Sequence, residues 1–373
     1  MNIVYLISRA ISSDGPVNQA LNILTGLNQI EGVKAILITL SPEIENRSWL
    51  YRFEERGIEV YQLNKPSWNI WGCISLLKSY IIEHKIDVVH SSGYRADIVN
   101  MYLNKYVTTV STQRSNPREL AEEFPKFLRF VINKYHIHVI KKIQAQVACS
   151  FSLQSIFSKE ENMDIECVQN AVNTDFFIPV NSAEKKMLRK ELNLPLNKTI
   201  YLVLGVLLPR KNNKVIIKAF IDAKLSNSEL IIVGGGIEES LLKELSGNNA
   251  DIKFVGITKN PIKYLQAADI LVSSSLAEGL PNTVLEALSC GLPVILSDIE
   301  PHKELLGNSE AGTIFNRYSV NELTDCLVES SHWNMAYRAR CARNIAEKRY
   351  SIKVLANSYL KIYQKYENVD EMI

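Results

Sequence analysis

The chain has 373 residues, and its 42 lysines and arginines against 40 aspartates and glutamates leave a formal net charge of +2. This near-neutral charge argues against a nucleic acid partner, because phosphate backbones are usually bound by a strong basic excess. The length suits two domains. The six cysteines show neither C-x-x-C pairs nor zinc-like spacing, and their dispersal favours a reducing cytoplasm.

The first half of the chain alternates strand-like runs with longer amphipathic segments. Helical periodicity predicts helices at residues 16–30 and 71–85. Short runs rich in β-branched residues are typical of strands and lie at residues 2–8, 33–40, 86–92, 107–113 and 145–150. This order predicts βαβ units around a parallel sheet.

The same alternation restarts near residue 199, with further strands expected at residues 229–236, 252–257, 269–275 and 293–298. The sequence therefore predicts an α/β fold of two Rossmann-like, doubly wound domains. Pro179 and polar neighbours interrupt the pattern between the two series. We expect a first domain of residues 1–178, with a C-terminal helix at about 350–373 packing back on it, and a second of residues 179–349.

Ligands of doubly wound sheets bind at the carboxyl ends of strands, so residues just after strands are the informative ones. Gly234 begins a run of three glycines at such a place, where a ligand could approach closely or a tight turn could form. Arg210 and Lys211 follow another strand. They suit an anionic ligand at a helix N-terminus or, equally, a solvated basic turn.

The stretch EGLPNTVLEAL, residues 278–288, reads as a loop that enters a helix. Pro281 suits the first helical turn, and the N–H groups of Asn282 and Thr283 would form a phosphate seat. Glu278 and Glu286 would then lie on roughly one side, where their carboxylates can accept hydrogen bonds from sugar hydroxyls. The alternative is a helix-terminal acid and an ordinary surface glutamate.

These features together resemble glycosyltransferase family 4, the retaining nucleotide-sugar transferases with the GT-B architecture of two domains facing across a cleft. The similarity covers nearly the whole chain. It rests on VACSFSLQSIF at residues 147–157, on CVQNAVNTDFFIP at residues 167–179, and on residues 254–306 with the Glu-x7-Glu motif at Glu278 and Glu286. Within the second segment, Ala171 and Asn173 replace the family's usual glycine and aspartate.

The resemblance implies a role for each motif. Glu286 is expected to bind the ribose hydroxyls, Glu278 the donor sugar, and Lys211 the diphosphate. Main-chain groups of Val255 and Gly256 would hold the base. The remaining residues implied to bind the donor are the glycine-loop residue Gly15, together with Gly205, Gly234, Gly279, Leu280, Pro281, Asn282 and Thr283.

No metal or cofactor is expected. The chain contains no D-x-D motif, which other transferases use to hold a divalent ion. Arg210, Lys211 and the helix N-terminus after Pro281 could instead stabilise the negative charge that develops on a nucleoside diphosphate leaving group.

The sequence also departs from the family pattern in places. Val206 stands where the family commonly has an arginine, so Arg210 becomes its candidate substitute. Cleft histidines of the family are replaced by Ser92 and by the Gln113-Arg114 pair. Arg114 therefore becomes a candidate contact for donor or acceptor. His90 is a candidate catalytic residue, or else a buried residue at the end of a strand.

Residues 125–142 mix aromatic and basic side chains in one helical segment. Such a face could lie on an anionic membrane surface, or it could be a core-packed helix with a solvated basic side. No run approaches the roughly 20 apolar residues of a spanning helix, so any membrane contact would be peripheral, on the inner face of the cell membrane.

The sequence thus predicts a metal-independent transferase that moves a hexosyl or N-acetylhexosaminyl group from a nucleotide sugar, most simply a UDP-sugar. A glycan or lipid-linked oligosaccharide is the expected acceptor, in synthesis of a bacterial surface polysaccharide such as a lipopolysaccharide O-antigen or capsule. Two alternatives stay open. One is a GT-B UDP-sugar 2-epimerase, and the other is a non-catalytic subunit that binds sugar nucleotides.

Overall fold

The structure of the chain, a computed structural model, describes residues 1–11, 15–116 and 125–370. The contacts divide it into two compact units, Met1–Ala171 with the C-terminal segment from Ile352, and Val172–Ser351. Residues 172–178, expected in the first domain, belong to the second unit. The guanidinium of Arg343 binds the carbonyl oxygens of Thr174 and Phe177 there, at 2.9 and 2.8 Å.

The first unit is built on a seven-stranded sheet in the order β3-β2-β1-β4-β5-β6-β7. Every neighbouring pair of strands is parallel. The strands are β1 (Asn2–Ile7), β2 (Lys34–Thr39), β3 (Val60–Gln62), β4 (Val88–Ser91), β5 (Thr108–Gln113), β6 (Ala145–Ala148) and β7 (Glu166–Cys167).

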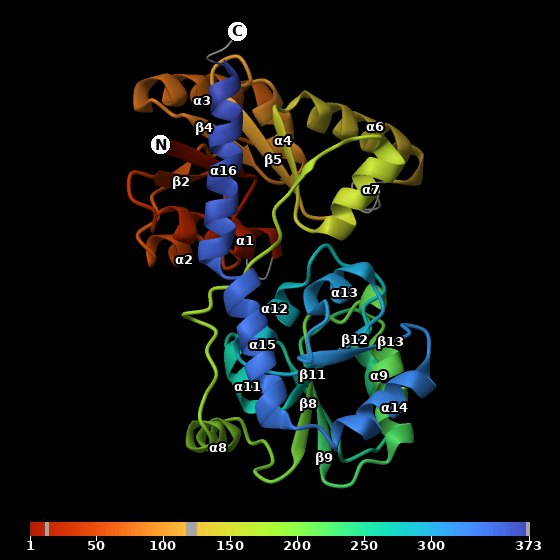
Figure 1. Cartoon of the computed structure of the whole chain (residues 1–373). Coiled ribbons are helices and arrows are strands. Elements are labelled where there is room, and N and C mark those ends of the chain that lie inside the picture. Colours follow the sequence, from red (N-terminus) through yellow and green to blue (C-terminus); the bar gives the residue numbers. More distant parts are fainter. Residues whose placement is uncertain (12–14, 117–124, 371–373) are drawn as a thin grey trace. The chain divides into compact units, whose positions relative to one another are not determined.

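Helices cover both faces of this sheet, because successive side chains of its buried strands point to opposite sides. Ile3 and Tyr5 pack in a core with α1 and α16, whereas Val4 and Leu6 pack in a second core with α3 and α4. Figure 1 shows α16, in blue, running beside α1. The helices are α1 (Gly15–Leu27), α2 (Leu50–Glu54), α3 (Ile70–His84), α4 (Tyr94–Met101), α6 (Lys126–Lys142), α7 (Phe151–Glu161) and α16 (Ile352–Asp370).

The second unit repeats this plan with a six-stranded parallel sheet in the order β10-β9-β8-β11-β12-β13. Its strands are β8 (Thr199–Leu204), β9 (Ser228–Val233), β10 (Ile252–Gly256), β11 (Ile270–Ser273), β12 (Val294–Ser297) and β13 (Gly312–Phe315). The predicted α/β fold with two parallel sheets is therefore confirmed.

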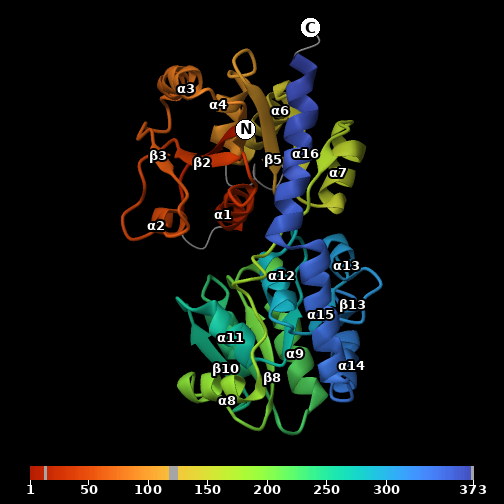
Figure 2. The same ribbon diagram turned by 60° about the vertical axis from the view of Figure 1, so that its left-hand side comes forward.

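Two groups of helices enclose the second sheet. Along β8, Ile200 and Leu202 face a core with α11, α12 and α15, whereas Tyr201 and Val203 face a core with α9 and α14. Figure 1 shows α9 and α14 side by side, and Figure 2 shows α8 next to α11. The helices are α8 (Ser182–Glu191), α9 (Asn213–Ala223), α10 (Glu239–Ser246), α11 (Pro261–Ala267), α12 (Asn282–Ser289), α13 (Glu300–Leu306), α14 (Val320–Ser330) and α15 (Met335–Arg349).

The strand order reverses direction once in each sheet, between β1 and β4 in the first unit and between β8 and β11 in the second. At such a point the two flanking connections leave the sheet on opposite faces and open a crevice outside the carboxyl ends of the strands. These two crevices are where the fold favours ligand binding. No helix in residues 1–11, 15–116 and 125–370 is long and apolar enough to cross a membrane.

Candidate functional site

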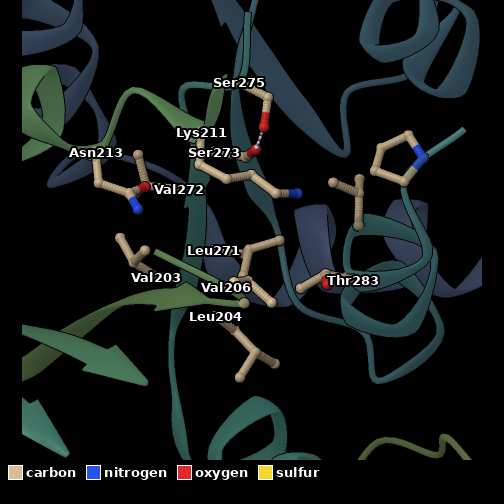
Figure 3. Close-up of a pocket in the computed structure, with 13 residues that line it drawn as sticks. Val203, Leu204, Val206, Lys211, Asn213, Leu271, Val272, Ser273, Ser275 and Thr283 are labelled. Carbon is tan, nitrogen blue, oxygen red and sulfur yellow. Dashed lines mark hydrogen bonds between the residues drawn. The ribbon is translucent and has the colours of Figure 1, made fainter. Parts of the chain in front are cut away.

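A pocket lies at the reversal point of the second sheet, outside the carboxyl ends of β8 and β11. Figure 3 shows Lys211, Ser273 and Ser275 on one side of this pocket and Val206 and Thr283 on another. Of the predicted donor-site residues, the pocket is lined by Gly205, Lys211, Pro281 and Thr283.

Glu278 is joined to both predicted cations. Its carboxylate lies 2.5 Å from the ammonium of Lys211 and 3.1 Å from the guanidinium of Arg210. Ser275 donates a hydrogen bond of 2.8 Å to the same carboxylate. The side chain of Glu278 is 9% exposed whereas that of Arg210 is 52% exposed, so the acid is sheltered and one cation remains open to a ligand.

This arrangement holds Glu278 as a carboxylate. Burial by itself would raise its pKa, but the charges of Lys211 and Arg210 and the hydrogen bonds from Lys211 and Ser275 outweigh burial and lower the pKa to about 2. The site therefore presents one negative and two positive charges at neutral pH.

The two cations are positioned by a short turn, Pro209–Lys211, between β8 and α9. Its backbone is held by the connection that follows β11. The Ser274 hydroxyl donates to the Lys211 carbonyl at 2.9 Å, and the Leu276 N–H donates to the Arg210 carbonyl at 2.8 Å. The cations and Glu278 thus sit on two connections that the parallel sheet brings side by side.

The loop after β11 leads through Gly279 and the buried Leu280 to Pro281, which caps α12 rather than lying in its first turn. The helix begins at Asn282, directly after Pro281, because Pro281 has extended backbone with a ψ of 117°. Glu286 lies four residues into α12 and is half-buried.

Glycines allow the connections after β8 and β9 to approach each other closely. A Cβ on Gly234 would lie 1.8 Å from the carbonyl oxygen of Gly205, and one on Gly236 would lie 2.3 Å from that of Leu207. The connection after β9 therefore lies directly against the connection after β8 at these two glycines. Gly205 itself has a φ of 143° and open space where a Cβ would project.

Val255 and Gly256, predicted to hold the base, lie at the end of β10. Gly256 has a φ of 81°, and its carbonyl oxygen accepts from the N–H of Gly234 at 2.8 Å. Four apolar side chains are exposed around this edge of the sheet, those of Val206, Ile237, Val255 and Ile257.

Two residues close to Glu278 were not predicted from the sequence. Ser275, its hydrogen-bond donor, is the last of three consecutive serines that begin with the final residue of β11, and that position was a usable signal. His302 is fully buried and binds Ser297, whose hydroxyl donates to the Ser275 carbonyl at 2.6 Å. No motif or spacing marked His302.

In the first unit, His90 is fully buried at the end of β4. Its two ring nitrogens lie 2.7 Å from the Tyr363 hydroxyl and 2.8 Å from the Thr112 hydroxyl. Burial, followed by the charge of Arg114, lowers its pKa well below the ordinary range. These contacts favour the buried alternative for His90 over a catalytic one.

Arg114 follows β5 and is partly exposed. Its guanidinium donates to Asn170 Oδ1 at 2.5 Å and to the Tyr5 hydroxyl at 3.2 Å. Gly15, predicted to belong to a glycine loop, is the first residue of α1, and residues 12–14 of that loop lie outside the described residues.

The predicted basic and aromatic segment at residues 125–142 forms α6. Its exposed apolar side chains are Phe127, Leu128, Phe130, Val131 and Tyr135, and the ammonium of Lys134 lies 4.5 Å from the ring centre of Phe130. The opposite side of the helix is anchored by His136, 3.1 Å from the buried carboxylate of Asp97.

Comparison with known proteins identifies both halves of the chain. The family described as Glycosyltransferase Family 4 matches residues 13–176, and the family described as Glycosyl transferases group 1 matches residues 184–348.

Two curated relatives illustrate the similarity. The N,N'-diacetylbacillosaminyl-diphospho-undecaprenol alpha-1,3-N-acetylgalactosaminyltransferase of Campylobacter jejuni is 28% identical over 258 residues, which cover 64% of this chain and 65% of the relative. The UDP-Gal:alpha-D-GlcNAc-diphosphoundecaprenol alpha-1,3-galactosyltransferase of Escherichia coli is 30% identical over 175 residues, which cover 44% of this chain and 45% of the relative. Both matches span less than two thirds of the relative's length.

Solved structures share the fold over nearly the whole chain. A glycosyltransferase from Rickettsia africae aligns with a TM-score of 0.78 at 19% identity and covers 98% of both chains. HepE from Anabaena, solved in complex with UDP, aligns with a TM-score of 0.79 at 18% identity and covers 98% of this chain and 100% of its own. With its sequence matches in both units and its two-unit GT-B fold, the chain belongs to glycosyltransferase family 4, a family of enzymes that transfer sugars.

Proposed function

We propose that this chain transfers a hexosyl or N-acetylhexosaminyl group from a nucleotide sugar, with retention of configuration and without a metal ion. The observation that carries the proposal is the cluster of Glu278, Lys211 and Arg210 at the carboxyl edge of the second sheet. It combines a sheltered acceptor of hydrogen bonds with two cations, which matches the sugar and the diphosphate of such a donor.

The cluster also suggests how the donor is received. Lys211 and Arg210 are both paired with Glu278 in the structure. A diphosphate carries more negative charge than one carboxylate and would draw both cations toward itself. The Glu278 carboxylate would then be released to accept hydrogen bonds from the sugar hydroxyls, and the cations would stabilise the leaving nucleoside diphosphate.

The remaining donor contacts follow from the pocket. Glu286 would bind the ribose, and the main chain of Val255 and Gly256 would bind the base beside the apolar side chains of Val206 and Ile257. UDP is the favoured nucleotide, since the Escherichia coli relative is named for UDP-Gal and HepE was solved with UDP.

A lipid-linked sugar diphosphate is the favoured acceptor. Both curated relatives are named for acceptors that carry a diphosphate on undecaprenol. An enzyme that acts on such a lipid must reach the membrane surface, and we assign this contact to α6. Phe127 and Phe130 are exposed there, and the helix contains several basic residues and no acidic one.

Aromatic residues of the neighbouring helices extend this surface. The rings of Trp71 and Tyr102 lie 5.0 Å apart, and the nearness of Tyr102 adds to burial in raising the pKa of Tyr135 on α6. Trp68 is also exposed. Tryptophan and tyrosine are the side chains that favour the interface between lipid and water.

Membrane binding is measured by flotation with vesicles that contain anionic lipid. We expect the double variant Phe127→Ser and Phe130→Ser to lose most of the bound fraction, whereas Tyr318→Ser, which removes an exposed aromatic ring of the second unit, should keep it. Equal flotation of both variants would exclude α6 as the membrane contact.

The nucleotide site is tested by thermal unfolding with UDP, GDP, ADP or CMP, each with and without EDTA. We expect UDP to stabilise the protein by about 2.7 kcal/mol at a hundredfold excess over its Kd, and EDTA to make no difference. Glu286→Ala should lose this stabilisation. Glu244→Ala, which removes an exposed carboxylate from α10, should keep it. Stabilisation by no nucleotide would contradict the proposed donor site.

A non-catalytic role in binding sugar nucleotides is the second candidate. Val206 is an exposed apolar residue at the position where the family commonly has an arginine, so the diphosphate would meet one cation fewer. A turnover assay distinguishes the catalytic role from the non-catalytic one. Product formed by the purified chain from a UDP-sugar and an undecaprenyl-diphosphate sugar would exclude the non-catalytic role.

A further inference from the structure

Arg114 is a sheltered cation that no carboxylate of the described residues neutralises. Its hydrogen-bond partners among the described residues, the Asn170 side chain and the Tyr5 hydroxyl, are not carboxylates. A guanidinium has five N–H groups. Two of them have partners within the described part of the first unit, and the Nε group is buried without one.

This state is energetically unusual. A charge removed from water is costly unless an opposite charge or a full set of hydrogen bonds compensates it. Arginine does not relieve the cost by losing its proton, because its pKa is too high. The buried Arg189 of the second unit, by comparison, has an acidic partner in Asp269 at 2.6 Å. A missing partner for Arg114 therefore points to a ligand that carries negative charge.

The surroundings of Arg114 are suited to such a ligand. The side chain emerges at the carboxyl end of β5, next to β4 and close to the reversal point of the first sheet. The residue is partly exposed, so part of it is open to a ligand. The neighbouring His90 is uncharged, because burial and then the charge of Arg114 lower its pKa. Of these two residues at the carboxyl ends of β4 and β5, Arg114 therefore carries the positive charge.

We propose that Arg114 binds a phosphoryl group of a substrate in the first unit. The assignment rests on the proposed function, in which both substrates carry a diphosphate. The planar guanidinium matches two oxygens of a phosphoryl group, and Asn170 and Tyr5 hold its plane in place. The phosphoryl group belongs either to the lipid-linked acceptor or to the nucleotide-sugar donor, and the two sources are separable by experiment.

The test uses the full chain and isothermal titration with inorganic pyrophosphate and with UDP. Arg114→Gln removes the charge and Arg114→Lys keeps it without the planar fork. Arg47→Gln is the matched control, since Arg47 is an exposed arginine of the same unit. Pyrophosphate is titrated into the protein alone and into the protein saturated with UDP, at constant ionic strength. Acetate is titrated separately to show whether a carboxylate binds as well.

If the proposal holds, Arg114→Gln lowers the affinity for pyrophosphate or UDP by roughly tenfold or more, as expected for loss of a charged hydrogen bond. Arg114→Lys should have an intermediate effect and Arg47→Gln none. Loss of pyrophosphate binding to the UDP-saturated protein, with UDP affinity unchanged, assigns the site to the acceptor. Weakened binding of UDP itself assigns it to the donor.

Unchanged affinities in Arg114→Gln and Arg114→Lys would overturn the proposal and leave Arg114 a structural residue. Acetate that binds as tightly as pyrophosphate would overturn the assignment to a phosphoryl group. Failure of the wild-type chain to bind UDP would contradict the proposed function instead. The titration of pyrophosphate alone would still decide the role of Arg114.

Discussion

At the scale of single residues, Glu278 has two functions that compete. It pairs with Lys211 and Arg210 in the structure, and the proposed mechanism needs the same carboxylate for the sugar. A site that is stable without its ligand must therefore be rearranged when the ligand arrives. Such competition between stability and binding is common at functional sites.

The variant Glu278→Gln separates these two functions. Removing one member of a largely sheltered ion pair leaves Lys211 without its partner, so we expect a loss of about 2 kcal/mol in the free energy of unfolding. UDP should then stabilise the variant more than the wild type, since both cations are available to it. Glycosyl transfer should fall by about a hundredfold.

These effects are measured by urea unfolding with and without UDP, and by turnover. Glu244→Gln serves as the control, because Glu244 is exposed on α10. A smaller stabilisation by UDP in Glu278→Gln than in wild type would show that Glu278 does not compete for the cations.

His302 makes stability depend on pH. Burial is the main cause that lowers its pKa to about 4, from an ordinary value of 6.5. Between these values the unfolded chain binds a proton that the folded protein does not, so stability decreases as pH falls from 6.5 to 4. When the pH falls from 6.5 to 5, the free energy of unfolding should decrease by about 2 kcal/mol less in His302→Gln than in wild type.

Urea unfolding at several pH values measures this difference. His332→Gln is a matched control, because His332 is an exposed histidine of the same unit. Wild-type and His302→Gln curves that remain parallel down to pH 5 would contradict the prediction.

At the scale of elements, the connections after β8 and β9 depend on two glycines for different reasons. Both have a positive φ, 143° for Gly205 and 137° for Gly234. At Gly205 a methyl group would meet open space, whereas at Gly234 it would collide with the Gly205 carbonyl oxygen. An alanine at either position would therefore have a strained backbone conformation, and at Gly234 it would also clash sterically.

The two substitutions should differ in size. Gly205→Ala should cost about 1–3 kcal/mol of stability through backbone strain. Gly234→Ala should cost clearly more, because the two connections must move apart, and it should abolish binding of UDP. Urea unfolding and UDP titration compare the variants directly. Equal losses of stability would mean that the connections separate without cost.

At the scale of the whole molecule, each unit has its own core. The first is closed by α16, which returns from the far end of the sequence and buries Tyr359 and Tyr363 against the first sheet. The His90 contacts of Tyr363 belong to this core. The stability of the first unit therefore depends on residues that are separated from it by the entire second unit.

We expect Tyr363→Ala to destabilise the first unit by about 3–5 kcal/mol, the usual cost of removing a large buried aromatic side chain. Hydrogen exchange resolved by peptide should become faster in β1, β4 and β5, and should stay unchanged in β8 to β13. Leu288→Ala creates a cavity in a core of the second unit. In this variant, hydrogen exchange should become faster in β8 to β13 and stay unchanged in β1, β4 and β5. A uniform loss of protection in either variant would show that the units unfold together.

The sequence by itself determined the alternation of strands and helices, the restart of that alternation near residue 199, and the loops that carry Glu278 and Lys211. These features follow from local periodicity and from residues at strand ends, which need no knowledge of distant contacts. Three strands, β3, β7 and β13, were not predicted. The first two have three and two residues, which are too few to show a period.

Tertiary structure alone decided which side chains meet. Glu278 and Lys211 are 67 positions apart, and His90 and Tyr363 are 273 apart. Their contacts exist because parallel strands align their carboxyl ends and because α16 returns to the first unit. Burial has the same origin. It leaves His90 uncharged and gives His302 its low pKa. It also leaves Arg114 without a counter-charge among residues 1–11, 15–116 and 125–370, because each of these states depends on what the fold packs around the residue.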